Sequence, residues 1–261
     1  MIGFKTKGPW SDRPVFMAKA GSAAYGTMTP TSDIDYRGVF LAEPQHLIGL
    51  SNVETYTEEQ PIDLQCFELR HYIRLCLKGS PLQLEMLYYP QDVVAASSVA
   101  WNKLVEIRQC FLGKHLKKTL GGFAQGDIKR IAADSTAKCG AKGKLLVEKY
   151  GYNTKHASNA YRLLQMAATL FTTGELVARP DLAAREEIIA IKNGKYKKEE
   201  FLKFIQEEDQ RVFALAENCA LPDGPDHHKA EEVAMSIYTS MLSDSGWREA
   251  QGIIPITHRT E

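Results

Sequence analysis

The sequence lacks the features of secreted, membrane-spanning and zinc-binding proteins. Its five cysteines are scattered and form neither a CxxC pair nor a Cys/His cluster with the spacing of a zinc site. The uncharged stretch 163–174 is far shorter than the roughly 20 apolar residues that span a bilayer. Residues 1–13 carry charges and a proline in place of the apolar core of a signal peptide. We therefore expect reduced thiols, no membrane partner and a cytoplasmic location.

The chain also lacks a net charge, because it holds 32 basic and 32 acidic side chains. This neutral average hides a basic middle: residues 103–162 hold 13 basic side chains against 4 acidic ones, a net charge of +9. Residues 1–102 (8 basic, 11 acidic) carry −3, and residues 163–261 (11 basic, 17 acidic) carry −6. A basic segment of this kind is either a solvated helical surface or a surface that meets phosphates.

The pattern of apolar residues divides the chain into two parts. Short apolar runs predict strands at 15–20, 34–42, 52–57 and 62–67, and helical spacing predicts a helix at 68–77. After about residue 98 only helical patterns remain. They predict helices at 99–120, 123–133, 138–150, 154–173, 183–193, 198–218 and 228–243. We therefore predict an α+β protein, with a mixed sheet and flanking helices in residues 1–98 and an all-helical part in residues 99–261.

The first predicted strand runs into a turn with two glycines, in the sequence AGSAAYGTMTPTSDIDYRGVF (residues 20–40). A Rossmann fingerprint is excluded, because Gly21 and Gly26 are not accompanied by the third glycine that G-x-G-x-x-G requires. A Walker A loop is excluded as well, because Thr27 stands where that motif has its phosphate-binding lysine.

The carboxylates that follow this turn predict a metal site. Asp33 and Asp35 are two residues apart at the predicted second strand, so they would point to the same face. Adjacent carboxylates repel unless a cation lies between them, and oxygen ligands of this kind bind Mg²⁺, which keeps water and phosphate as further ligands. Gly21 allows close backbone approach, and Ser22 and the amides after it can donate hydrogen bonds to phosphate oxygens. A D-x-D sequence alone is usually a solvated turn; the glycine–serine turn before it favours the metal site.

Gly21-Ser22 is followed about ten residues later by Asp33 and Asp35, with one apolar residue between the aspartates. This pattern resembles the motif of the DNA polymerase β nucleotidyltransferase superfamily. The longer stretch 21–35 is similar to its RNA-ligase-associated (RNA repair) branch of bacteria and phages, and residues 62–85, 152–163 and 173–176 support the likeness. The resemblance implies a nucleotidyltransferase catalytic domain in residues 1–98. It also implies a helical domain in residues 99–261 that binds substrate and nucleotide, closes the cleft and supplies cations.

The family has a third carboxylate on a neighbouring strand, and Asp63 matches it by position. The alternation of polar and apolar residues in 62–65 also places Asp63 on the face opposite the core. Glu54 is the main alternative, followed by Glu59. By resemblance, Asp33, Asp35 and Asp63 would be the catalytic residues and would hold two Mg²⁺ ions, with Mn²⁺ as a substitute.

A further set of residues is predicted to bind the nucleotide. Several of them have a second interpretation. Arg37 either binds phosphate or pairs with the aspartates, Tyr25 either stacks on a base or packs in the turn, and His156 either lines the cleft or is an ordinary histidine at a helix start. Lys155 and Arg162 share a helix face that lines the cleft by resemblance or simply faces solvent. The run 138–144 is either a mobile phosphate-binding loop or a solvated turn. The predicted nucleotide-binding residues are Gly21, Ser22, Tyr25, Thr27, Ser32, Arg37, Lys155, His156 and Arg162.

These observations lead to a functional hypothesis with open alternatives. The chain would move an NMP or dNMP from a nucleoside triphosphate such as ATP to an acceptor hydroxyl, with a nucleic acid 3′ end in RNA repair as the preferred acceptor. The base, the sugar, templating and the oligomeric state are left open. The alternatives are nucleotidylation of a small molecule or a protein hydroxyl, and a non-catalytic nucleic-acid-binding module. The last predicts loss of acidic residues, but all three candidate acids are present.

Overall fold

A computed structural model describes residues 14–30, 32–43, 46–47, 49–50, 53–59, 62–133 and 140–243. Its strands form one mixed sheet in the order β3-β4-β2-β1-β5. β1 runs antiparallel to β2 and β5, whereas β2 and β4 are parallel. The four predicted strands are confirmed within a few residues, and β5 was not predicted. The strands are β1 (Pro14–Lys19), β2 (Asp35–Phe40), β3 (Thr55–Glu58), β4 (Asp63–Glu68) and β5 (Val94–Ser97).

The parallel pairing of β2 and β4 brings the amino ends of both strands to the same end of the sheet. The register pairs Asp35 with Asp63 and Phe40 with Glu68. β1 ends at the same place, because the Ala20 amide donates a 2.8 Å hydrogen bond to the Asp35 carbonyl. The turn after β1 and the first residues of β2 and β4 therefore meet at one end of the sheet.

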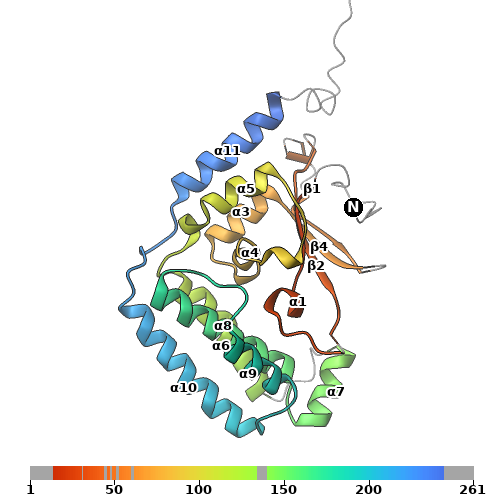
Figure 1. Ribbon diagram of the computed structural model, residues 1–261, viewed down its shortest axis with the longest axis vertical. Helices are drawn as coiled ribbons and strands as arrows, with labels where there is room; N and C mark the ends of the chain where they lie inside the picture. The colour runs from red at the N-terminus through yellow and green to blue at the C-terminus, as the bar shows by residue number, and fades with distance from the viewer. Residues whose placement is uncertain are drawn as a thin grey trace, which may run out of the picture.

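Three helices that follow β4 in the chain pack beside the sheet (Figure 1): α3 (Leu69–Leu77), α4 (Pro81–Met86) and α5 (Val99–Glu106). Trp101 of α5 stacks on Phe16 of β1, with 3.9 Å between the ring centroids. Both side chains are almost fully buried, so this contact fixes α5 against the sheet.

Beyond β5, helices make up the regular structure of the described residues. α8 is at their centre, because it packs against α6, α9 and α10. The Asn153 side chain accepts two amide hydrogen bonds at the start of α8, and Gly174 ends the helix in the left-handed conformation. These caps explain why the predicted helix 154–173 is confirmed. The helices are η2 (Arg108–Phe111), α6 (Leu116–Ala132), α7 (Ala141–Tyr150), α8 (Thr154–Thr173), α9 (Leu182–Lys192), α10 (Lys198–Glu217) and α11 (His227–Ser243).

The prediction of one helix over 99–120 is wrong. The chain bends between α5 and α6, where Gly113 lies against the loop 222–224: a Cβ at Gly113 would be 2.9 Å from the Pro222 carbonyl oxygen. The Lys114 amide donates to the same oxygen at 2.7 Å. α6 then continues through the predicted start of a new helix at residue 123.

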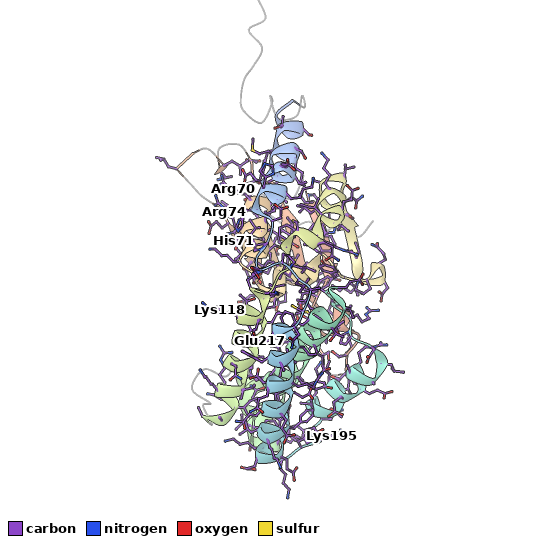
Figure 2. The ribbon with its side chains drawn as sticks, turned by 90° about the vertical axis from the view of Figure 1, so that its left-hand side faces the viewer. Arg70, His71, Arg74, Lys118, Lys195 and Glu217 are labelled. Carbon is purple, nitrogen blue, oxygen red and sulfur yellow. The ribbon has the colours of Figure 1, made fainter. Side chains whose placement is uncertain are left out.

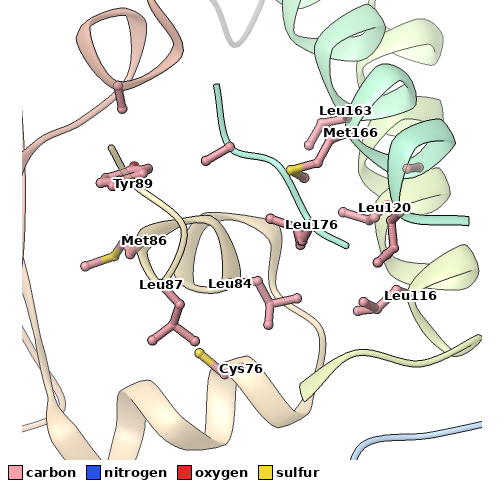
Figure 3. Close-up of a cluster of buried hydrophobic side chains, with 14 of the residues drawn as sticks. Cys76, Leu84, Met86, Leu87, Tyr89, Leu116, Leu120, Leu163, Met166 and Leu176 are labelled. Atoms are coloured by element: carbon pink, nitrogen blue, oxygen red, sulfur yellow. The ribbon is translucent and has the colours of Figure 1, made fainter. Parts of the chain in front are cut away.

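One hydrophobic core joins the two parts of the chain. Figure 3 shows Leu84 of α4 in one cluster with Leu116 of α6 and Met166 of α8, and all three are buried. The described chain changes from strands to helices after Ser97, but the division into two domains near residue 98 stays a prediction.

Two further observations concern the composition of the described residues. None of their helices combines the length and the apolar character needed to cross a bilayer. The four cysteines among them, Cys66, Cys76, Cys110 and Cys219, are free, and Cys139 lies outside the described residues.

Candidate active site

The turn after β1 is built around Gly21, which has a left-handed φ of 57°. A Cβ at this position would lie 2.8 Å from Asp35 Oδ2, so only glycine lets the backbone approach this carboxylate. The short helix α1 (Ser22–Tyr25) follows and ends at Gly26, which is also left-handed. The Thr27 amide closes the segment by donating to the Ser22 carbonyl at 2.9 Å. We call residues 21–27 the glycine–serine turn.

Asp35 and Asp63 are the first residues of two neighbouring parallel strands and are paired in register. Adjacent strands lie about 4.8 Å apart, so the two carboxylates start side by side. Burial raises the pKa of Asp35, and the negative charges of Asp63 and Asp33 raise it further, against the opposing effect of Arg37 and Lys155. The rise comes from burial, because the effect of Arg37 is larger than that of Asp63 and the effect of Lys155 is larger than that of Asp33. A divalent cation would offset this cost of burying the negative charge.

Asp33 lies before β2, so the expectation that Asp33 and Asp35 share a strand face is wrong. The ladder ends at Asp35, because the last pair between β1 and β2 is Lys19 with Tyr36 and because β4 begins opposite Asp35. Instead, the Asp33 carboxylate accepts from Lys142 Nζ at 2.6 and 2.7 Å. This contact lowers the pKa of Asp33. Both side chains are largely exposed, so solvent weakens the pair.

The strand register shows which of the three candidates for the third carboxylate lies beside Asp35. The Glu54 carbonyl accepts the amide of Glu68, so Glu54 lies at the far end of β4. Glu59 follows the last residue of the edge strand β3, and β4 lies between β3 and β2. Asp63 is the candidate that is paired with Asp35. Its role in catalysis and metal binding stays a prediction.

The carboxylates partly fit the expected magnesium site. Asp35 and Asp63 offer the hard oxygen ligands that Mg²⁺ prefers, and their mutual repulsion favours a bound cation. However, among the residues that the structure describes, no three Asp, Glu, His or Cys side chains lie close enough together to hold a metal ion. Asp33 would complete such a set only after it releases Lys142.

Two predicted nucleotide-binding residues near the carboxylates have contacts within the chain. Arg37 Nη1 donates to the Tyr36 carbonyl at 2.9 Å and lies 3.8 Å from Asp63 Oδ1. Arg37 Nε is buried and has no hydrogen-bond partner among the described residues. The Ser32 hydroxyl accepts the Thr29 amide at 2.9 Å and thereby holds the loop before Asp33.

Tyr25 and Arg162 belong to a buried network with Glu85. Arg162 Nη1 donates to Glu85 Oε2 at 2.7 Å, and the Tyr25 hydroxyl donates to the other carboxylate oxygen. The Arg162 guanidinium also lies over the Tyr25 ring, 3.9 Å from its centroid. Arg162 is 6% exposed and Glu85 is 0% exposed. This network connects the glycine–serine turn to α4 and α8, and it occupies two side chains that were predicted to bind nucleotide.

His156 joins α8 to α6 through Asp127. His156 Nδ1 lies 2.7 Å from Asp127 Oδ1, and Asn159 and Arg130 donate to the same carboxylate. Burial would raise the pKa of Asp127, but these hydrogen bonds outweigh it and hold the pKa below its usual value. Lys155 differs, because its ammonium makes no ion pair with any described residue. Its charge nevertheless lowers the pKa of Asp33 and of Asp35.

Lys192, at the end of α9, is a site residue that the sequence did not predict. Its Nζ donates to the Thr27 carbonyl at 2.9 Å and lies 3.2 Å from Thr27 Oγ1, so it reaches the glycine–serine turn. Burial lowers the pKa of Lys192, and the positive charges of Lys155 and Arg162 lower it further. Because these partners are neutral, a half-buried positive charge is held beside the turn without a carboxylate partner among the described residues. No local sequence feature distinguishes this lysine.

The basic segment 103–162 does not form one surface. Lys142 and Lys144 lie on α7, so the expected loop at 138–144 is helical from Ala141 onward, and residues 138–139 lie outside the described residues. Other cations of the segment have internal acidic partners, as in the ion pairs of Lys117 with Glu217 and of Arg162 with Glu85. Lys142 and Lys155 are the members that lie near the carboxylates.

Comparison with known proteins identifies the family. Residues 11–235 match the model of the RNA repair pathway DNA polymerase beta family. The match covers most of the chain, so this protein belongs to that family, and the resemblance in the sequence is confirmed.

Two individual proteins show a weaker likeness. An uncharacterized 38.9 kDa protein from the nrdC-mobD intergenic region of Enterobacteria phage T4 is 26% identical over 113 residues, which are 39% of this chain and 34% of the relative. The chain thus spans about a third of the length of this relative. The crystal structure of a nucleotidyltransferase-like protein from Exiguobacterium sibiricum 255-15 aligns with 90% of this chain and 72% of its own, at 12% identity and a TM-score of 0.28.

Proposed function

We propose that this protein is a metal-dependent nucleotidyltransferase that moves an NMP or dNMP from a nucleoside triphosphate to a nucleic acid 3′ hydroxyl during RNA repair. The observation that carries this proposal is the in-register pair of Asp35 and Asp63 beside the backbone of Gly21. Membership of the RNA repair pathway DNA polymerase beta family supports the choice of a nucleic acid acceptor.

The proposal gives each side of the site a role. Asp35 and Asp63, joined by Asp33, would hold Mg²⁺, which neutralises a triphosphate and lowers the pKa of an attacking hydroxyl when bound. Gly21 lets the backbone of the turn approach the Asp35 carboxylate, so phosphates bound to the metal would lie beside the turn. Lys155 and Lys192 face this place from the helical part and would stabilise the negative charge of the leaving pyrophosphate.

The test is transfer of a label from each α-³²P-labelled ribo- or deoxynucleoside triphosphate, with Mg²⁺ or Mn²⁺, to RNA, DNA or no added acceptor. We expect labelled nucleic acid. Asp35→Asn and Asp63→Asn should each reduce the rate at least about a hundredfold, because a metal ligand contributes several kcal/mol to the transition state. Asp223→Asn is the matched control, since its side chain is 99% exposed in the 222–224 loop, and it should keep the wild-type rate.

The other outcomes identify the alternatives. Label on the protein or on a small molecule, without label on either nucleic acid, would replace the acceptor. Nucleotide binding by the wild type without transfer to any acceptor would favour a non-catalytic module. Wild-type turnover in correctly folded Asp35→Asn would contradict the carboxylate assignment.

A further inference from the structure

Helix α3 carries a row of cations on its exposed side. Arg70, Arg74 and Lys78 follow one another at intervals of four residues, at the start, in the middle and just past the end of the helix. Side chains at this spacing share a helix face and are about 6 Å apart along the axis. Arg74 and Lys78 are exposed and Arg70 is half-buried.

The row continues onto α6. A Cβ at Gly79 would lie 2.7 Å from Leu116 Cδ2 and 2.8 Å from Thr119 Oγ1, so the end of α3 contacts the first turn of α6. Lys118 lies between these two α6 residues in sequence and is exposed. Figure 2 shows Arg70, Arg74 and Lys118 in succession down one side of the molecule. We call Arg70, Arg74, Lys78 and Lys118 the basic ridge.

Acidic side chains do not neutralise the basic ridge. None of its four cationic groups forms an ion pair or hydrogen bond through its side chain with the described residues, whereas the neighbouring Lys117 binds Glu217. Two carboxylates lie at the start of α3. That of Glu68, the N-cap residue, accepts from the amides of Arg70 and His71 and from the Tyr238 hydroxyl, and that of Glu54 lies 3.6 Å from His71 Nδ1. Arg70 also stands in the first turn of a helix, where the helix dipole disfavours a positive charge.

We propose that the basic ridge binds the sugar-phosphate backbone of a nucleic acid strand. A row of positive charges fits a linear polyanion, whereas a single phosphate would need side chains that converge on one point. A membrane surface would need apolar side chains among the cations, but none of the exposed large apolar residues in the described chain lies on α3. They are Met28, Ile34, Leu50, Val99, Phe123, Leu145, Val177, Leu182, Phe213 and Met235.

The basic ridge begins away from the candidate active site. Asp63 and Glu68 are the first and last residues of β4, so about 17 Å of strand separates Asp63 from the place where α3 starts. A strand on the ridge would therefore be held outside the carboxylates and positioned without taking part in the chemistry. Phosphate contacts carry no base information, so the binding is independent of sequence. The inference rests on the proposed function only for the choice of nucleic acid as the polyanion.

The test is fluorescence anisotropy of labelled single-stranded RNA and DNA with the full chain over a salt series, without nucleotide or divalent metal. Four phosphate contacts give a slope of log affinity against log salt of about −3, at roughly 0.7 per contact. The double substitution Arg74→Gln/Lys78→Gln should reduce the magnitude of this slope by about 1.4 and weaken RNA and DNA binding alike. Both side chains are exposed and unpaired among the described residues, so an unchanged melting temperature is expected.

The control is Lys129→Gln/Lys203→Gln, which removes the same charge from exposed lysines of α6 and α10 outside the ridge. It should leave the slope unchanged. An equal change in both double variants, no change in either, or no binding of either strand by the wild type would overturn the proposal. Ridge-dependent binding to phosphatidylserine vesicles with unchanged strand binding would replace the nucleic acid by a membrane. Because no nucleotide or metal is present, this result is independent of whether transfer is observed.

Discussion

Replacing Glu85 by glutamine is expected to lower the free energy of unfolding by about 3 kcal/mol. Glu85 is fully buried and is bonded through both carboxylate oxygens, to Arg162 at 2.7 Å and to the Tyr25 hydroxyl. Glutamine keeps the shape and one acceptor for Tyr25, but it removes the negative charge. The Arg162 guanidinium would then be a buried cation whose remaining partners, Asn159 Oδ1 at 3.1 Å and the Tyr25 ring, are neutral.

The magnitude follows from the cost of leaving one member of a buried ion pair uncompensated, which is about 3–5 kcal/mol. The cation–π contact with Tyr25 persists in the variant and stabilises the guanidinium by up to about 2 kcal/mol, so we expect the lower end of that range. For a chain of this size, about 3 kcal/mol corresponds to a decrease in melting temperature of roughly 6–12 °C.

Urea unfolding followed by circular dichroism measures this loss, with Arg162→Met and the double variant completing a cycle. The coupling free energy between the two sites should be about 2 kcal/mol, because the double variant no longer contains a lone buried charge. Glu232→Gln is the control, since this carboxylate is half-exposed and pairs with Lys229 on the same helix, and it should change stability by less than about 0.5 kcal/mol. Wild-type stability in Glu85→Gln at an unchanged m value, or additive effects in the cycle, would refute the reasoning.

Two further predictions concern single charges. Lys192→Gln should weaken binding of ATP with Mg²⁺ about 10- to 100-fold in calorimetry, which is the effect of one charge-assisted hydrogen bond. The control Lys195→Gln, which loses an exposed ion pair with Glu187, should bind as the wild type does. Equal affinities of the two variants would contradict the role of Lys192. Because the pKa of Asp127 is lowered in the folded protein, its carboxylate stabilises the fold fully above about pH 5, and this effect is lost as the pH falls below about 3.9. The difference in unfolding free energy between wild type and Asp127→Asn should therefore be larger at pH 7 than at pH 3. A difference that stays constant with pH would disprove this prediction.

The sequence predicted those features that depend on neighbours along the chain. α8 was predicted at 154–173 with its observed bounds, because Asn153 and Gly174 are strong helix-start and helix-end residues. The alternation around Asp63 predicted its place on β4, and the register now pairs it with Asp35. The bend at Gly113 had no such local cause, because it depends on a loop more than one hundred residues away.

Partners distant in the sequence explain the differences at the site. Arg162 was expected to line the cleft, but Glu85, 77 residues away, holds it in the core. Lys192 reaches Thr27 across 165 residues, and nothing in its own segment indicates this contact. A single sequence shows which residue types are available and with what periodicity, whereas the pairing of charges is decided by the packing of helices on the sheet.

The neutral composition of the chain includes two groups of opposite charge that approach each other at one end of the sheet. Asp35 and Asp63 begin two parallel strands, and their negative charges act on one another. Lys155 and Lys192 reach the same place from α8 and α9, and their positive charges act on one another as well. Burial is the main cost of holding a charge at Asp35 and at Lys192, like charges add to it, and in the described residues neither lysine has a carboxylate partner. A triphosphate with its metal ion carries both signs and, in the proposed function, would bring its cation to the aspartates and its phosphates to the lysines. This matching of charge is the physical reason for preferring a nucleotide–metal complex to a purely anionic or purely cationic ligand.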